Sequence, residues 1–195
     1  MEKNISLESI ERVGRRLFMQ RSGLFAVGAA SALALAAPGR ALAASGKRGV
    51  AEDVAILNTA LGLEYQAIAA YQVGAESGLL QKPVLDLAVQ FQGHHKAHAE
   101  VLAATIGKLG GKPVMAMMAK DYGFPVDSLK DQADVLRFAA GLEKGAASAY
   151  LGAVPQFDNR ELARAAASIL GDETMHWAVL LNALGENPVP AAFIG

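Results

Sequence analysis

An internal repeat is the feature of this sequence that most constrains its fold. Gly-Leu-Glu, followed by a tyrosine seven residues after the glutamate, occurs at Glu64 and Tyr71 and again at Glu143 and Tyr150, an offset of 79 residues. A second motif begins with Gly, ends with His and recurs at an offset of 78 residues. Its two copies are residues 93–98 and 171–176. The chain is therefore expected to contain two copies of one structural unit.

Apolar residues in each copy recur at steps of three and four, which places them on one face of a helix. Four helices are predicted, at about residues 50–77, 83–109, 128–152 and 158–184. Their inward stripes are Leu57, Leu61, Glu64, Ile68 and Tyr71; Phe91, His95, His98, Leu102 and Ile106; Leu136, Ala140, Glu143, Ala147 and Tyr150; and Leu162, Ala166, Ile169, Glu173, His176 and Leu180. Each copy is thus a pair of amphipathic helices.

The connections predict how the helices are joined. Residues 111–127 show no periodicity, and 17 extended residues reach about 56 Å, more than the ~40 Å length of a 27-residue helix. This segment is expected to cross the bundle between helices two and three, while the short connections make each pair an antiparallel hairpin. Ser128 with Asp131, and Asp158 with Glu161, resemble helix N-terminal caps. The fold class is an all-α four-helix bundle.

Carboxylates and imidazoles interrupt the apolar stripes. Glu173 and His176 stand three residues apart, so both side chains lie on one helix face. Burying a charged side chain costs free energy unless the charge is paired or binds a metal, and metal binding is the interpretation favoured here. The alternative interpretation is that the acids and imidazoles pair with one another without an ion. The chain has no cysteine, so any metal would have nitrogen and oxygen ligands. The candidate metal ligands are Glu64, His95, His98, Glu143, Glu173 and His176.

Other polar and sulfur-containing residues lie outside these stripes. His94 is expected to be partly exposed beside the site, and Glu100 to be solvated. Tyr71 and Tyr150 are expected to pack in the core, with hydrogen bonds or electron donation near the site as the alternative. Three methionines of the crossover are expected to form its apolar underside, with soft Cu(I) ligands as the alternative. They are Met115, Met117 and Met118.

The N-terminal segment has the pattern of an export signal. Arg15 and Arg16 stand in a motif similar to the twin-arginine signal, and the apolar segment Leu24–Ala37 is shorter than a membrane span. Ala41–Ala43 fits a cleavage site, which predicts a mature protein from about Ala44. An uncleaved anchor is the alternative. Residues 1–43 are thus assigned to the signal and 44–195 to the bundle domain.

The charge of the mature chain argues against a nucleic-acid partner. Of the 18 basic and 19 acidic residues, residues 1–43 contain six and three, which leaves 12 and 16. A net charge of −4 without a basic patch does not favour binding to phosphate backbones. The predicted partners are metal ions, the twin-arginine export machinery, the membrane during export only, and a second copy of the chain as a homodimer.

The doubled hairpin, the long crossover and the Glu-x-x-His spacing resemble the ferritin-like superfamily, in particular its exported bacterial branch. The resemblance covers about residues 50–184 and implies a glutamate from helices one and three and Glu-x-x-His from helices two and four. On this sequence these are Glu64, Glu143, His98, and Glu173 with His176. The sixth position departs, because His95 stands where the family has glutamate.

The resemblance implies iron as the metal, with manganese, zinc or copper as alternatives. A site with three carboxylates and three imidazoles should bind zinc or copper in preference to manganese or iron, or should hold a single ion. The favoured function is a periplasmic or otherwise extracytoplasmic metal-binding protein that handles metal or reacts with O₂ or peroxide. A non-catalytic stress or interaction module with a degenerate site is the alternative, and an iron-storage cage ranks last.

Overall fold

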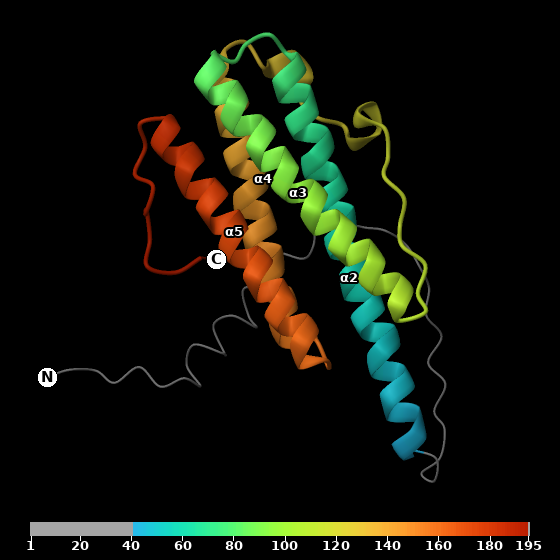
Figure 1. The fold of residues 1–195 in the computed structure, drawn as a ribbon. Helices are drawn as coiled ribbons and strands as arrows, with labels where there is room; N and C mark the ends of the chain where they lie inside the picture. The colour runs from blue at the N-terminus through green and yellow to red at the C-terminus, as the bar shows by residue number, and fades with distance from the viewer. Residues whose placement is uncertain (1–40, 195) are drawn as a thin grey trace, which may run out of the picture. The chain divides into compact units, whose positions relative to one another are not determined.

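The computed structural model describes residues 41–194, and four long helices dominate this part of the chain (Figure 1). The helices are α2 (Ala41–Glu76), α3 (Lys82–Lys108), α4 (Gln132–Ala153) and α5 (Arg160–Ala183), with short 3₁₀ turns η2 (Ala119–Tyr122), η3 (Val126–Ser128) and η4 (Val154–Gln156). Residues 46–194 form one compact unit. Within residues 41–194, no helix combines the length and hydropathy needed to span a bilayer. The twin-arginine motif and the apolar segment lie outside the described residues.

Helix α2 begins earlier than the sequence predicted. The segment 44–49, expected to be a polar leader, is helical and continuous with the rest of α2, although Ser45, Gly46 and Gly49 are weak helix formers. A close approach follows at Gly49, where a side chain would clash with Asp158 Oδ2. The buried Asp53 carboxylate then accepts hydrogen bonds from the Asp158 and Asn159 amides at 2.9 and 3.2 Å. The start of α2 therefore holds the connection between α4 and α5.

The predicted N-terminal caps of α4 and α5 are wrong, by three residues and by one residue respectively. Helix α4 is capped by Asp131, whose side chain accepts from the Asp134 amide, while Ser128 lies in the preceding 3₁₀ turn. Helix α5 is capped by the Asn159 side chain instead of Asp158, whose carboxylate lies against Gly49 of α2. The other predicted boundaries agree, including Pro83 in the first turn of α3 and a helix end before Gly185.

The crossover runs along the bundle from one end towards the other (Figure 1). Near its start, the Asn58 side chain of α2 donates to the Lys112 carbonyl at 3.2 Å and accepts from the Val114 amide at 2.8 Å. At its far end, Gln132 accepts from the Gln81 amide in the α2–α3 connection at 2.9 Å. Helices α3 and α4 therefore start at the same end, as predicted for two hairpins joined by a long connection.

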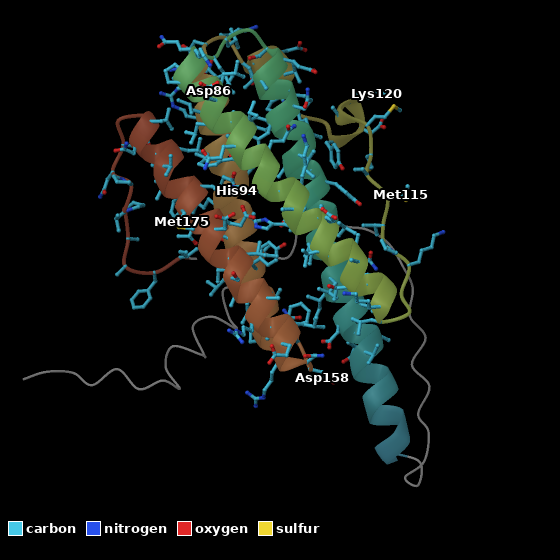
Figure 2. The ribbon with its side chains drawn as sticks, in the orientation of Figure 1. Asp86, His94, Met115, Lys120, Asp158 and Met175 are labelled. Atoms are coloured by element: carbon cyan, nitrogen blue, oxygen red, sulfur yellow. The ribbon has the colours of Figure 1, made fainter. Side chains whose placement is uncertain are left out.

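The three crossover methionines do not form its underside, so that prediction is wrong. Met115, Met117 and Met118 are 82%, 53% and 61% exposed, and Figure 2 shows Met115 on the outer side of the crossover. Aromatic contacts attach this segment instead, with Phe124 stacked on Tyr122 and edge-on to Phe138 of α4. An irregular segment has no period from which its buried face could be predicted.

The core consists of two apolar clusters with a polar layer between them. One cluster centres on Leu61 and Ile106 and the other on Phe91 and Leu136. The four predicted stripes supply nearly all of these side chains, with Ile68 and Leu162 only partly buried. The predicted all-α bundle of two antiparallel hairpins is thus confirmed, and its polar layer lies where the glutamate and histidine residues interrupt the stripes.

Candidate metal centre

The six predicted ligand residues meet in the polar layer of the bundle. Each helix contributes, and the set is Glu64 from α2, His95 and His98 from α3, Glu143 from α4, and Glu173 and His176 from α5. These six residues are called the inner cluster below. All are buried except His98, whose side chain is 16% exposed. The 3.6-residue period of four helices therefore delivers three carboxylates and three imidazoles to one region.

Two ligand sets share the inner cluster. The first surrounds Glu64, whose Oε2 is 2.8 Å from His95 Nδ1 and 3.5 Å from His98 Nδ1. The second surrounds Glu143, whose Oε1 is 3.2 Å from His95 Nε2 and 3.5 Å from His176 Nδ1.

Glu173 joins both sets, because Oε1 is 3.2 Å from His98 Nδ1 and Oε2 is 3.5 Å from His176 Nδ1. Within each set, one ligand atom per residue lies within 4.8 Å of the others. This arrangement is consistent with two neighbouring ion positions that share Glu173, with His95 beside both of them.

Two buried tyrosines hold the carboxylates that face them. The Tyr71 hydroxyl of α2 donates to Glu143 Oε1 of α4, and the Tyr150 hydroxyl of α4 donates to Glu64 Oε1 of α2 at 2.5 Å. Burial and the neighbouring carboxylates raise the pKa of both tyrosines, so they remain neutral donors.

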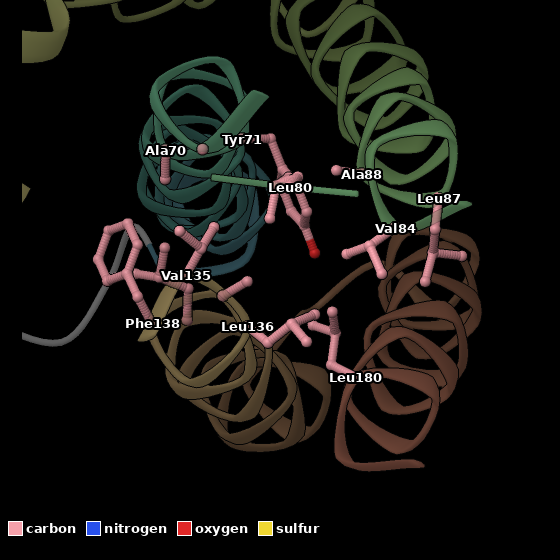
Figure 3. Close-up of a pocket in the computed structure, with 13 residues that line it drawn as sticks. Ala70, Tyr71, Leu80, Val84, Leu87, Ala88, Val135, Leu136, Phe138 and Leu180 are labelled. Carbon is pink, nitrogen blue, oxygen red and sulfur yellow. The ribbon is translucent and has the colours of Figure 1, made fainter. Parts of the chain in front are cut away.

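Tyr71 also borders an apolar cavity, and Figure 3 shows its hydroxyl oxygen pointing towards the middle of the bundle. The tyrosines therefore combine the predicted core packing with hydrogen bonds to the site.

Mutual electrostatic effects shift the pKa values of the inner cluster. Burial opposes protonation of His95, but hydrogen bonds to Glu143 and Glu64 outweigh it and raise its pKa to about 10. Burial is likewise outweighed by neighbouring carboxylates at His98 and His176, whose pKa values rise to about 9.

The pKa values of the three carboxyl groups shift in opposite directions. Burial opposes ionisation of Glu64 and Glu143, but hydrogen bonds with histidines outweigh it, so the pKa values of both carboxyls are lowered. The pKa of Glu173 is raised, mainly by burial. Without an ion, the cluster is a set of carboxylate–imidazolium pairs in which Glu173 is the least compensated member.

Several buried atoms of the inner cluster lack a hydrogen-bond partner among the described residues. They are His98 Nδ1, Glu143 Oε2, Glu173 Oε1, Glu173 Oε2 and His176 Nδ1. Glu173 Oε1 and His98 Nδ1 are 3.2 Å apart, yet their directions do not satisfy hydrogen-bond geometry. Buried polar atoms are nearly always satisfied, and each exception calls for an explanation. All five atoms are potential metal ligands, so bound cations in the two ligand sets would satisfy the group.

Comparison with known proteins identifies the fold. A ferritin-like domain model matches residues 52–186. The chain belongs to the ferritin-like domain family. A conserved hypothetical protein from Mycobacterium tuberculosis is 22% identical with a TM-score of 0.62, over 74% of this chain and 99% of that one. Ferritin-like diiron-carboxylate proteins from Bacillus anthracis strain Ames are 25% identical with a TM-score of 0.59, over 70% and 97%. Among curated proteins, no match was found.

The ferritin-like fold predicted from the doubled hairpin is therefore confirmed. The resemblance implied glutamate at residue 95, and His95 instead places one ring nitrogen towards Glu64 and the other towards Glu143. A neutral imidazole has one free lone pair, so a neutral His95 can ligate one of two ions but not both. The ferritin-like site of this chain is accordingly asymmetric.

Sequence analysis missed one residue of this ferritin-like site. Asp172 Oδ2 is 3.2 Å from His94 Nδ1, 3.3 Å from His98 Nε2 and 3.4 Å from His176 Nε2. Asp172 lies off the inward stripe, but it stands in the repeat where the first copy has His94. That correspondence was the available signal. His94 is 40% exposed beside the cluster, as predicted, and Glu100 is exposed.

Proposed function

We propose that this ferritin-like protein binds two divalent metal ions in its inner cluster. One position would use Glu64, His98 and Glu173, and the other Glu143, His176 and Glu173, with His95 completing one of them. The observation that carries the proposal is the group of five buried ligand atoms without hydrogen-bond partners. Two positively charged ions would satisfy these atoms and offset the burial of three carboxylates.

The donor set bears on the choice of metal. The family places four carboxylates and two imidazoles around two ions, whereas this chain presents three of each. Nitrogen-rich sites bind copper and zinc more strongly than manganese. Iron remains the metal favoured by the family, because a similar structure is described as a diiron-carboxylate protein. A bound pair of redox-active ions would supply electrons to O₂ or peroxide.

The side chains of this chain would support such chemistry in three ways. Tyr71 and Tyr150 fix the orientation of Glu143 and Glu64 and keep one oxygen of each in place. The apolar clusters on both sides of the polar layer exclude water, which strengthens electrostatic interactions there. The imidazolium protons of the three histidines would leave as ions bind, since ligands must be deprotonated.

A non-catalytic bundle with a degenerate site is the second candidate. His95 favours it, because its two ring nitrogens lie within hydrogen-bond distance of both Glu64 and Glu143. An imidazolium at this position would neutralise part of the carboxylate charge without any ion. This bundle would then act through its surface, as a stress or interaction module.

Export through the twin-arginine route forms part of the proposal. The route carries folded proteins, which suits a bundle loaded with metal before export. Residues 44–195 would then be the periplasmic form. Cell fractionation and N-terminal sequencing of the mature protein test this, and a cytoplasmic protein with an intact Met1 would contradict it.

The deciding experiment is metal analysis of the protein purified gently from its own host. We expect about two ions per chain, and size-exclusion chromatography should give a monomer or a dimer instead of a cage. Iron-loaded protein should then consume O₂ or peroxide in single-turnover measurements. Protein with well under one ion per chain would favour the degenerate bundle, as would loaded protein that reacts with neither oxidant.

A further inference from the structure

We propose that a second, solvent-facing cation site lies on the outer side of the inner cluster and serves as the entry site for its ions. It consists of His94 Nδ1, Asp172 Oδ2 and His176 Nε2, called the outer triad here. The proposal rests on the proposed function of the inner cluster. It would take the same class of ligand, a divalent transition-metal ion.

The atoms of the outer triad have the spacing of metal ligands. His94 Nδ1 is 2.9 Å from His176 Nε2 and 3.2 Å from Asp172 Oδ2, and the third edge is 3.4 Å. Two atoms that are each about 2.1 Å from one ion lie about 3.0 Å apart at a right angle and about 3.4 Å apart at the tetrahedral angle. One ion can therefore contact all three atoms with little rearrangement.

The repeat explains why the triad lies between α3 and α5. His94 and Asp172 occupy equivalent positions in the two copies, one on each helix, and each precedes an inner-cluster residue. The two antiparallel helices bring these positions together above the inner cluster, and Figure 2 shows His94 on this face. An imidazole in one copy and a carboxylate in the other produce a mixed ligand set there.

Exposure falls steadily from the outer triad to the inner cluster. The side chains of His94, Asp172 and His98 are 40%, 21% and 16% exposed, whereas His176 and Glu173 are buried. The apolar cavities beside Tyr71 and Tyr150 are lined by none of the inner-cluster residues. The α3–α5 side is thus the polar approach to the inner cluster.

His176 and His98 connect the two sites through opposite ring nitrogens. Each turns Nδ1 towards the inner cluster and Nε2 towards Asp172. A neutral imidazole has one free lone pair, so His176 cannot hold an outer and an inner ion at once. Binding through His176 at the outer triad and at the inner cluster is therefore mutually exclusive, as expected where an ion passes from one site to the other. Three protein ligands leave further coordination positions to water.

The test follows metal uptake by full-length, metal-free protein. Trp177, the one tryptophan of the chain, adjoins His176, so quenching of its fluorescence reports Co²⁺ entering this region. We expect His94→Ala to slow Co²⁺ uptake about tenfold at limiting Co²⁺. The magnitude is that typical of removing a metal ligand or a residue that hydrogen-bonds to one. The final content of the inner cluster should stay at the wild-type value. Glu100→Gln, on the exposed face of α3, is the matched control and should behave as wild type.

His94→Asn separates ion binding from hydrogen bonding. Asparagine places an acceptor near the former Nδ1, so it can receive a hydrogen bond from His176 but is a weak ligand. Slow uptake in both His94 variants supports the entry site. Wild-type uptake in His94→Ala overturns it, and so does full rescue by His94→Asn. If the wild-type protein takes up no Co²⁺ at all, the proposed function fails together with the entry site.

Discussion

Replacing Glu173 by leucine should stabilise the metal-free protein while removing its response to metal. Both Glu173 oxygens are buried without hydrogen-bond partners, and burial raises the pKa of this carboxyl. A carboxyl with a raised pKa in the folded state destabilises that state at pH 7, where it is ionised in the unfolded chain. Replacing all partners of a buried ion pair by apolar side chains of similar volume is often neutral or stabilising by about 1–4 kcal/mol, whereas removing one partner of a well-formed pair destabilises the protein. Glu173 differs from a well-formed pair because neither of its oxygens has a hydrogen-bond partner.

The expected gain for Glu173→Leu is about 2 kcal/mol, since the imidazoles that lose this partner can become neutral. In a domain of this size, the melting temperature should rise by about 4–8 °C. The assay is thermal unfolding of chelated protein at pH 7, with Glu173→Gln as a control of nearly the same size. The glutamine side chain would remain a buried polar group with few partners, so we expect a smaller gain for this control.

Metal should reverse the order of stability. An ion at 100 times its dissociation constant stabilises the wild type by about 2.7 kcal/mol, whereas Glu173→Leu should gain little because it lacks the ligand shared by both positions. A Glu173→Leu protein that is less stable than wild type after chelation would refute the reasoning about burial. One that keeps the full stabilisation by metal would refute the role of Glu173.

Three further predictions concern the same cluster. His95→Glu should restore the family's carboxylate and shift binding from Zn²⁺ towards Mn²⁺ in competition assays, and unchanged selectivity would contradict this. Tyr71→Phe removes the hydrogen bond to Glu143 and should weaken metal binding about tenfold in titrations; wild-type affinity would show that the bond is dispensable. The pKa values of His95, His98 and His176 are raised from 6.5 to about 10, 9 and 9, so the stabilisation that they give is complete below pH 6.5, decreases as the pH rises above that value and is lost above about pH 10. The melting temperature of chelated protein should therefore fall as the pH approaches 10, and a flat profile would argue against the ion pairs.

Most of the fold could be predicted because it depends on the regular spacing of apolar residues along each helix. The inward stripes place Glu64, Glu143 and Glu173 correctly, since a helix has one buried face and the repeat sets the same phase in both hairpins. The limits of the helices were less predictable. Asn159 is the cap instead of Asp158, whose carboxylate lies against Gly49 of α2, more than a hundred residues away in the sequence.

The residues that were missed depend on how helices cross. Asp172 lies off the stripe of its own helix, and it reaches the site only because α5 and α3 pack together there. The same crossing brings His94 against His176. Likewise, the exposure of Met115 follows from the path of an irregular segment. Local sequence patterns determine which face of a helix is buried, but contacts between helices require the packed structure.

We propose above that two ions lie side by side within the bundle. Anomalous diffraction from crystals of the Co²⁺-loaded or iron-loaded protein tests it most directly. We expect two peaks on either side of Glu173, one beside Glu64 and His98 and the other beside Glu143 and His176. Fully loaded crystals with no peak inside the bundle, or with peaks on the surface only, would contradict the account.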